Sequence, residues 1–420
     1  MRNPGFLWII IGIMVLLDIY VFQAVKIVTQ NSSPKTRLII FSVYWALSAA
    51  TVLLLILLPY INYENWPRAV RTYLFATVLG LFFAKMIAVV FFLIDDIRRL
   101  IQWASGKVFF RNTEAEGFSG QGISRSVFLS WLGLGTGASL FGTLVYGFGN
   151  KYKYEVRRIK LVYENLPKGF KGLKIIQVSD IHSGSFTDKQ AVMKGVEKVL
   201  KENPDLILFT GDLVNDRAIE MHDYMDVFNR LKAPMGVFST LGNHDYGDYH
   251  YGHNPVGKEA IEKEENLKRV KEIHGELGWK LLLDEHVILE RGGEQIALIG
   301  VQNISAKPRF HTYGDMAKAY SGTEKYPFKI LMSHDPSHWE GEVTPKYSDI
   351  DLMLAGHTHG MQFGVELPGF KWSPVEYVYK EWAGLYETGK QKLYVNRGFG
   401  FIGYPGRVGI LPEITVIELV

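Results

Sequence analysis

The sequence contains no cysteine, which excludes disulfide bonds and thiolate metal ligands. Any metal ion must therefore be held by His, Asp, Glu or Asn side chains. A large excess of charge of one sign is also missing, because 46 basic and 43 acidic residues leave a formal net charge of +3. Because the charges are so nearly balanced, the sequence does not indicate nucleic acid or another strongly charged macromolecule as a partner. The 420 residues exceed one ordinary domain, and the two ends differ in composition, so we expect two parts.

The first third of the chain is dominated by long apolar runs. A helix needs about 20 such residues to cross a bilayer. We therefore predict a transmembrane region over residues 1–150 with four spans, at about 6–27, 38–61, 73–94 and 127–148. A cleaved signal peptide would not be followed by three more spans. The sequence predicts a multi-pass protein of the cell membrane, with a soluble part over residues 151–420.

Two charged residues, Asp18 and Lys85, lie inside predicted spans, where an unpaired charge is costly. They either pair with each other or reach an interface or a polar seam between helices. We assign them no function.

The orientation in the membrane follows from basic residues near the span ends, because loops rich in Lys and Arg stay in the cytoplasm. The count is nearly level between the two sides: one side carries Lys26, Lys35, Arg37, Arg98, Arg99, Lys107, Arg111 and Arg125, and the other carries Arg2, Arg68, Arg71, Lys151, Lys153, Arg157, Arg158 and Lys160. The segment from Ser124 to Leu129 resembles a twin-arginine export signal with one arginine missing, which would export the C-terminal part of the chain. An ordinary basic flank of a span is the alternative. We favour an extracytoplasmic soluble part.

After Lys160, short apolar runs alternate with polar, helix-like stretches, which indicates a mixed α/β domain. A helical spacing of valines over 189–202 suggests a crossover between parallel strands, and a second helix-like stretch covers 257–275. The expected strands are 173–178, 205–210, 236–241, 296–301, 328–333, 350–355, 392–396 and 414–419.

Five of these strands are followed directly by metal-ligand residue types. The loops at the carboxyl ends of strands form the site crevice of α/β sheets, so these side chains can meet in space. Taken singly, each motif occurs by chance, and the glycines beside them fit plain turn chemistry. In chain order the residues are Asp180 and His182, then Asp212 and Asn215, then Asn243, His244 and Asp245, then His334, then His357 and His359.

Taken together and in this order, the motifs resemble the calcineurin-like metallophosphoesterase superfamily, and in particular its membrane-associated bacterial branch with N-terminal transmembrane helices. The resemblance covers roughly residues 155–420, and the four spans add to it. It implies an α/β fold in which a four-helix transmembrane N-terminal region is followed by a two-sheet α/β metallophosphoesterase sandwich. The motifs that carry it are Asp180-x-His182, Gly211-Asp212-x-x-Asn215, Gly242-Asn243-His244-Asp245, His334 and Gly356-His357-Thr358-His359.

The resemblance also implies a dinuclear metal centre. Asp180, His182 and His359 would hold the first ion, Asn243, His334 and His357 the second, and Asp212 would bridge both. Two close dications repel, and a shared carboxylate and hydroxide supply negative charge between them. The bridging hydroxide would then attack phosphorus. Nitrogen and oxygen ligands suit Mn, Fe or Zn without choosing among them.

Two further residues are expected to act on the substrate. His244 would hydrogen-bond the phosphoryl group or protonate the leaving oxygen, with Asp245 orienting its imidazole; alternatively, His244 only braces the turn. Asn215 is expected to orient Asp212 or Asn243. Relatives usually have glycine where this chain has Met361, which we expect to affect the mouth of the pocket.

The function that these features predict is a membrane-anchored, metal-dependent phosphoesterase acting on a phospholipid or other lipid-linked phosphoester. The alternatives are a phosphodiesterase or nucleotidase for a soluble substrate, with the spans as a simple anchor, and a non-enzymatic membrane sensor. The oligomeric state stays open. Many aromatic residues between 368 and 404 would either dock on the bilayer or pack in the core, and Lys371, Lys380 and Arg397 could meet a phosphate or an anionic lipid.

Overall fold

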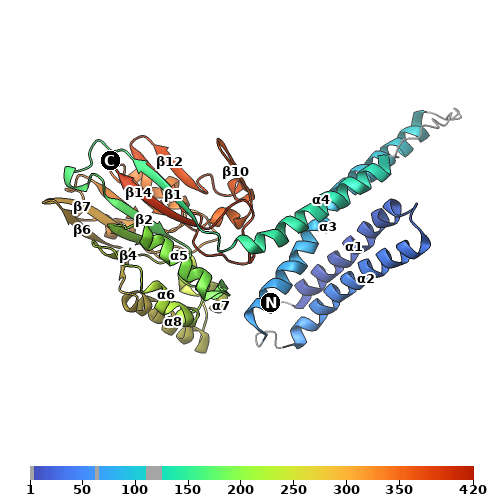
Figure 1. Cartoon of the computed structure of the whole chain (residues 1–420), viewed down its shortest axis with the longest axis horizontal. Coiled ribbons are helices and arrows are strands. Elements are labelled where there is room, and N and C mark those ends of the chain that lie inside the picture. The colour runs from blue at the N-terminus through green and yellow to red at the C-terminus, as the bar shows by residue number, and fades with distance from the viewer. Residues whose placement is uncertain (1–3, 62–65, 110–124) are drawn as a thin grey trace. The chain divides into compact units, whose positions relative to one another are not determined.

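The structure, a computed structural model, describes residues 4–61, 66–109 and 125–420 (Figure 1). Its contacts divide the chain into an N-terminal unit, Met1–Tyr146, and a C-terminal unit, Gly147–Val420. Four helices of the described N-terminal region are long and apolar enough to cross a membrane, which confirms the predicted spans as helices. They are α1 (Pro4–Val28), α2 (Pro34–Leu57), α3 (Arg68–Phe109) and α4 (Arg125–Gly147).

Helix α3 is longer than the predicted span, because it continues through a charged segment. Asp95 forms ion pairs with two arginines that lie one turn further along the same helix, Arg98 at 2.7 Å and Arg99 at 2.8 Å. The two arginines therefore belong to the part of the helix that continues beyond the predicted span.

Some positions in the orientation argument lie outside the described residues. They are Arg2, Arg111 and Ser124.

The two intramembrane charges form an ion pair. The Lys85 ammonium donates to the Asp18 carboxylate, and the Asp18 side chain is only 3% exposed. The Tyr44 hydroxyl of α2 donates to the Asp18 backbone carbonyl of α1 at 2.7 Å, so α2 is hydrogen-bonded to α1 beside the ion pair. Pairing, the first of the two predicted alternatives, is confirmed.

The C-terminal unit contains two six-stranded sheets. In spatial order, the first sheet consists of β1 (Glu155–Leu161), β14 (Glu413–Leu419), β2 (Lys174–Val178), β3 (Leu206–Phe209), β4 (Val237–Ser239) and β5 (Lys280–Leu281). The second consists of β12 (Gly384–Thr388), β13 (Gln391–Val395), β9 (Leu352–Ala355), β8 (Lys329–Met332), β7 (Glu294–Gly300) and β6 (Glu285–Arg291).

The centre of each sheet is parallel. Strands β2 to β5 run parallel in the first sheet, and β13, β9, β8 and β7 do so in the second. The expected crossover between β2 and β3 is present as α5 (Lys189–Lys201), whose N-cap Asp188 accepts the Ala191 N–H at 3.0 Å. All eight expected strands are present. Those not expected are short or lie towards the sheet edges, where the apolar pattern is weaker: β1, β5, β6 and β12, and the separate ribbon of β10 (Val365–Leu367) and β11 (Phe370–Trp372).

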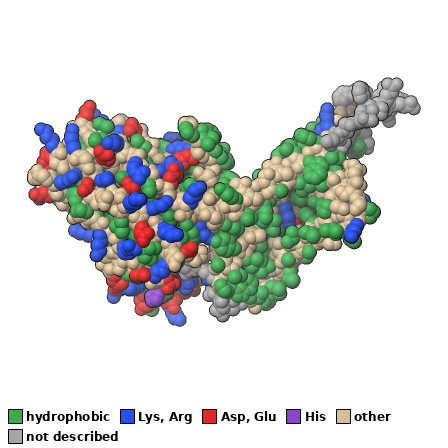
Figure 2. Space-filling view, in the orientation of Figure 1, with side chains coloured by type: hydrophobic (Ala, Val, Ile, Leu, Met, Phe, Trp, Pro, Cys, Tyr) green, Lys and Arg blue, Asp and Glu red, His purple; other side chains and the backbone are tan. Residues whose placement is uncertain are grey.

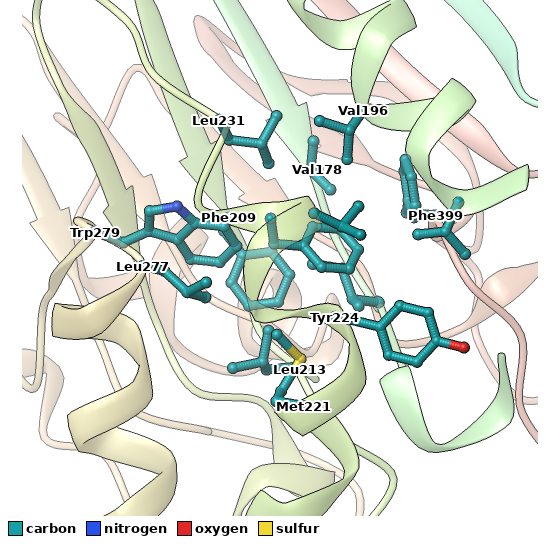
Figure 3. Packing of buried hydrophobic residues seen from close by; sticks show 14 of the residues in the cluster. Val178, Val196, Phe209, Leu213, Met221, Tyr224, Leu231, Leu277, Trp279 and Phe399 are labelled. Atoms are coloured by element: carbon teal, nitrogen blue, oxygen red, sulfur yellow. The ribbon is translucent and has the colours of Figure 1, made fainter. Parts of the chain in front are cut away.

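Apolar clusters separate the layers. One lies between the sheets, with Leu208 from the first and Leu354 from the second, both fully buried. A second lies between the outer face of the first sheet and its helices, where Phe209 packs near Trp279 and Val178 near Val196 (Figure 3). This layered sandwich confirms the predicted fold class. The other helices of the unit are α6 (Met225–Phe228), α7 (Asp248–Tyr251), α8 (Lys258–Glu276), α9 (Met316–Tyr320) and α10 (Thr344–Lys346).

Candidate metal centre

Five parallel strands, from both sheets, end at the same edge of the sandwich. The Gln177 amide joins the two sheets there, because its Nε2 donates to the Ala355 carbonyl at 2.8 Å and to Thr210 Oγ1 at 3.1 Å. Ala355 is the last residue of β9, and Gln177 is the last but one of β2. This amide therefore holds the ends of β2 and β9 together where their loops begin.

Six of the seven predicted ligands form two compact triplets, in each of which the ligand atoms lie within 4.8 Å of one another. The triplets are Asp180, His182 and His359, and Asp212, His334 and His357. The seventh, Asn243, joins the second triplet, since its Oδ1 lies 2.8 Å from Nδ1 of His357. The structure thus brings all seven together, in the grouping that the resemblance implies. Their role as metal ligands stays a prediction.

Asp212 lies between the two triplets. Its Oδ2 is 3.0 Å from Nε2 of His334, in its own triplet, and 3.5 Å from Nε2 of His182, in the other. Its Oδ1 accepts the backbone N–H of His244 at 2.8 Å, which fixes the carboxylate. A carboxylate in this position is suited to bridging two ions.

The residues present fit metal ions by two independent observations. First, neither ring nitrogen of the buried His182 has a hydrogen-bond partner among the described residues. Leaving a buried polar atom unpaired costs about 1 to 3 kcal/mol, a cost that a bound metal ion would remove. In addition, five of the seven adopt the left-handed backbone conformation that non-glycine residues rarely adopt, with φ between 48° and 72°. Strain of this kind gathers at functional sites. The strained residues are Asp180, His182, Asp212, His357 and His359.

The protonation states agree with ligand chemistry. Burial lowers the pKa of His182, His357 and His359, so their imidazoles are neutral, the form that binds metal. Burial also opposes charge on His334, but the Asp212 carboxylate outweighs it and raises the pKa of His334 to about 10. His334 is therefore the exception among the four histidines, because it must lose its proton before it can bind a metal ion.

His244 lies beside the ligands and is oriented differently from the prediction. Its Nδ1 is 2.6 Å from the Asn215 carbonyl, and its ring lies 4.9 Å from that of His182. Asp245 does not contact the imidazole; its buried carboxylate accepts four backbone N–H groups, those of Asp212, Leu213, Val214 and Gly242, at 2.8 to 3.2 Å. The predicted orienting role of Asp245 was therefore wrong, and Asp245 instead holds two site loops together.

Asn215 also differs from the prediction. Its side chain exchanges hydrogen bonds with Ser185 Oγ at 3.1 and 3.3 Å, instead of orienting Asp212 or Asn243. Its backbone carbonyl orients His244, and its N–H donates to Glu220 at 2.6 Å. Contacts of the backbone groups do not depend on the type of the residue, so the sequence could not predict them.

Two tyrosines were not singled out by sequence reasoning. The Tyr379 hydroxyl is 2.9 Å from Nε2 of His357, and the Tyr249 ring stacks on His244 at 4.4 Å. Tyr379 was only one of many aromatics in its segment, and Tyr249 belongs to none of the motifs.

A buried arginine supports the first triplet. The Arg407 guanidinium lies 3.2 Å from Nδ1 of His359 and donates to the Arg397 carbonyl at 2.7 Å. No pattern around Arg407 indicated this contact.

Of the other predicted phosphate contacts, that of Arg397 was wrong because the side chain is buried in an ion pair, whereas those of Lys371 and Lys380 stay predictions. Arg397 is 2% exposed and pairs with the buried Glu413, Lys371 donates to Tyr386 at 2.9 Å, and Lys380 pairs with Glu340 at 2.8 Å. Met361 is 57% exposed, and its φ of 53° is a conformation that glycine adopts more readily than methionine. Of the aromatics between 368 and 404, five pack in the core: Tyr379, Trp382, Tyr394, Phe399 and Phe401.

The fold and the site define a two-sheet α/β sandwich with a cluster of carboxylate, imidazole and amide groups at its strand ends. Residues 173–361 match the family described as Calcineurin-like phosphoesterase, and residues 1–150 match the Probable Calcineurin-like phosphoesterase, transmembrane domain. The chain belongs to this family of membrane-anchored metallophosphoesterases.

Several curated proteins are similar to part of this chain. The metallophosphoesterase YkuE of Bacillus subtilis is 30% identical over 60% of this chain and 81% of its own length. The phosphodiesterase YaeI of Escherichia coli is 29% identical over 59% of this chain and 82% of its own. A transmembrane protein with metallophosphoesterase domain from Danio rerio is 28% identical over 66% of this chain, which spans only 60% of that relative.

Proposed function

We propose that this protein hydrolyses a phosphoester carried by a membrane lipid, with two metal ions held by the two ligand triplets. The observation that carries the dinuclear part is the position of Asp212, whose carboxylate is within 3.5 Å of a histidine of each triplet. When bound, the two ions would lower the pKa of water to give a hydroxide nucleophile and would polarise the phosphoryl group. The ligand set suits Mn, Fe or Zn.

The chain's own residues have distinct tasks in this proposal. With Nδ1 donating to the Asn215 carbonyl at 2.6 Å, His244 keeps Nε2 for the substrate. A second ring proton, on Nε2, would hydrogen-bond the phosphoryl oxygen or pass to the leaving oxygen, and the ring would then be neutral with its remaining proton on Nδ1. Asp245 positions the loops of Asp212 and Asn243 through its four backbone N–H contacts. Tyr379 holds the His357 ring at 2.9 Å.

A cavity of about 330 Å³ that Tyr379 also lines is our candidate for the part of the substrate beyond the phosphate. The Lys307 ammonium lies 5.3 Å from the Tyr379 ring centre and also lines this cavity. This volume is at the small end of the range of about 300 to 1,000 Å³ for ligand sites, so it suits a head group better than a whole lipid.

The test of the dinuclear mechanism is Asp212→Asn. We expect the purified full-length variant to lose metal by plasma mass spectrometry and to lose hydrolysis of an aryl phosphodiester. The matched control is Asp223→Asn, whose side chain is 75% exposed. Full activity of a metal-replete Asp212→Asn protein would contradict the mechanism.

The lipid part rests on the tether. Four spans keep the C-terminal unit close to the bilayer, which raises the effective concentration of membrane-borne substrates. We expect kcat/KM for a lipid phosphoester in mixed micelles to exceed that for water-soluble aryl esters.

A phosphodiesterase for a soluble substrate is the second candidate, supported by the name of the Escherichia coli relative. In that case a lipid moiety would bring no gain in the same comparison, and the spans would serve only as an anchor.

We also propose that the protein lies in the cell membrane with its C-terminal unit on the extracytoplasmic side. The partial export signal at residues 124–129 supports this orientation. Protease added to intact cells should then remove the C-terminal unit. Digestion only after lysis would place that unit in the cytoplasm.

A further inference from the structure

The ribbon formed by β10 and β11 has two chemically different faces. The strands pair Val365 with Trp372, Glu366 with Lys371, and Leu367 with Phe370. Directly opposed residues share a face and neighbours along a strand alternate, so the four apolar side chains lie together and the two charged ones lie on the other face. The ribbon is therefore amphipathic.

The charged face is fastened to the C-terminal unit. Glu366 accepts hydrogen bonds from the buried Arg397 at 2.6 Å and from Arg157 of β1 at 2.8 and 2.9 Å. Lys371 donates to the Tyr386 hydroxyl at 2.9 Å. Because these contacts determine which face points inwards, they also force the apolar face outwards.

The apolar face is exposed to a degree that is unusual for such side chains. Val365, Leu367 and Phe370 are 42%, 61% and 56% exposed. Trp372 is half-buried, and its indole N–H donates to the hydroxyl of Tyr377, which is 77% exposed. Hydrophobic side chains gather over the ribbon in the space-filling view (Figure 2). A contiguous exposed apolar patch of this kind marks an interaction surface.

The base of the ribbon adjoins both the metal centre and the point where the chain leaves the last span. Gly364 and Gly147 are held by consecutive residues: the Gly364 N–H donates to the Val408 carbonyl at 2.9 Å, and the Arg407 N–H donates to the Gly147 carbonyl at 3.0 Å. Gly147 is the last residue of α4. On the other side, Ser373 Oγ donates at 2.9 Å to the carbonyl of Gly360, next to the ligand His359.

We propose that the apolar face of the ribbon, Val365, Leu367, Phe370 and Trp372, docks into the surface of the bilayer that holds the spans. The membrane is the favoured occupant because the ribbon base is hydrogen-bonded next to the end of α4. Trp and Tyr at the edge of an apolar patch also suit the membrane interface, where the ring is buried and the polar edge stays hydrated. The ribbon has six residues, whereas specific protein interfaces use about 20 to 30 a side.

Docking would hold the metal centre next to the lipid head groups. This consequence rests on the proposed lipid substrate, but the docking itself does not.

The absence of cysteine allows a direct test in the full-length protein. A fluorophore on Phe370→Cys is compared, in nanodiscs of phosphatidylethanolamine and phosphatidylglycerol, with the same label on Val256→Cys, an apolar position that is 84% exposed outside the ribbon. We expect quenchers on the lipid chains to quench the label at 370 and aqueous iodide to quench the label at 256. Equal iodide quenching at both positions would overturn the proposal. Protection at 370 without lipid quenching would assign the face to a protein or a second copy and would also overturn it.

A second variant separates docking from catalysis. The double substitution Leu367→Glu with Phe370→Glu should lower turnover of a lipid phosphoester in nanodiscs by roughly tenfold or more, as expected for a lost second attachment. Turnover of a soluble aryl phosphodiester should not change, nor should either activity in the matched Val256→Glu control. Unchanged lipid turnover in the double variant would count against docking. If the parent protein hydrolyses no lipid, the proposed substrate fails, while the quenching result still decides on docking.

Discussion

The backbone carbonyl of Asn215 lies 2.6 Å from Nδ1 of His244 and so determines which ring nitrogen carries the proton. Nδ1 must donate, which leaves Nε2 as the nitrogen available to a substrate. A backbone partner cannot be removed by a side-chain substitution, so the role of this tautomer is tested on the histidine.

Replacing His244 should separate catalysis from metal binding. We expect His244→Ala to lower kcat for an aryl phosphodiester by about 10² to 10⁴, the usual contribution of a general acid or base, while the metal content stays that of the parent. Steady-state kinetics and plasma mass spectrometry measure the two effects. His222→Ala, at a side chain 80% exposed, is the control. Loss of metal in His244→Ala would show that His244 is a ligand after all.

Gly356 should be intolerant of any side chain. A methyl group there would overlap the carboxylate of Asp180 and the hydroxyl of Ser179, and both belong to the fully buried floor of the site. We expect Gly356→Ala to lose bound metal and activity while remaining folded by circular dichroism. Gly275→Ala in α8, where a methyl group meets open space, should keep both. A metal-replete Gly356→Ala protein would contradict this geometry.

The ion pair between Asp18 and Lys85 should appear as coupling in a double-mutant cycle. An unpaired charge in a span costs about 2.5 to 3.5 kcal/mol on insertion scales, so Asp18→Asn and Lys85→Met should each lower the melting temperature in detergent. The double variant leaves neither charge unpaired and should be destabilised by less than the sum of the two. Tryptophan fluorescence during heating gives the melting temperatures. Additive effects would mean that the pair contributes no stability.

His274 should make the C-terminal unit sensitive to acid. Burial lowers the pKa of His274 to about 3, whereas an unfolded histidine has a pKa of about 6.5. Between these values the unfolded state binds the extra proton, so stability falls as the pH falls below about 6.5 and is unaffected above it. At pH 5 the loss should be about 2 kcal/mol.

Pulse proteolysis in urea at pH 7 and pH 5 measures this effect. The variant His274→Gln, which keeps a donor for Ser239 Oγ (2.9 Å from the histidine Nδ1), should show a smaller loss than the parent. Equal losses in the two proteins would assign the acid sensitivity to other groups.

The residue pattern by itself determined the spans, the eight principal strands and the ligand-type residues at five strand ends, and the resemblance to the family implied which seven of these residues hold metal. Span length, strand alternation and the residues after a strand are local properties, and parallel strands bring their carboxyl ends to one edge of a sheet. These features could therefore be predicted without knowing how the loops fold.

Only the tertiary structure decided the partners of the polar groups. Asp245 binds the loop N–H groups instead of His244, Arg397 is buried against Glu413 instead of meeting a phosphate, and Glu366 turns the apolar face of the ribbon outwards. Most of these partners lie 16 to 33 positions apart along the chain. They depend on how separate loops converge in space, and residue type alone specifies a hydrogen-bonding capacity without naming the partner that satisfies it.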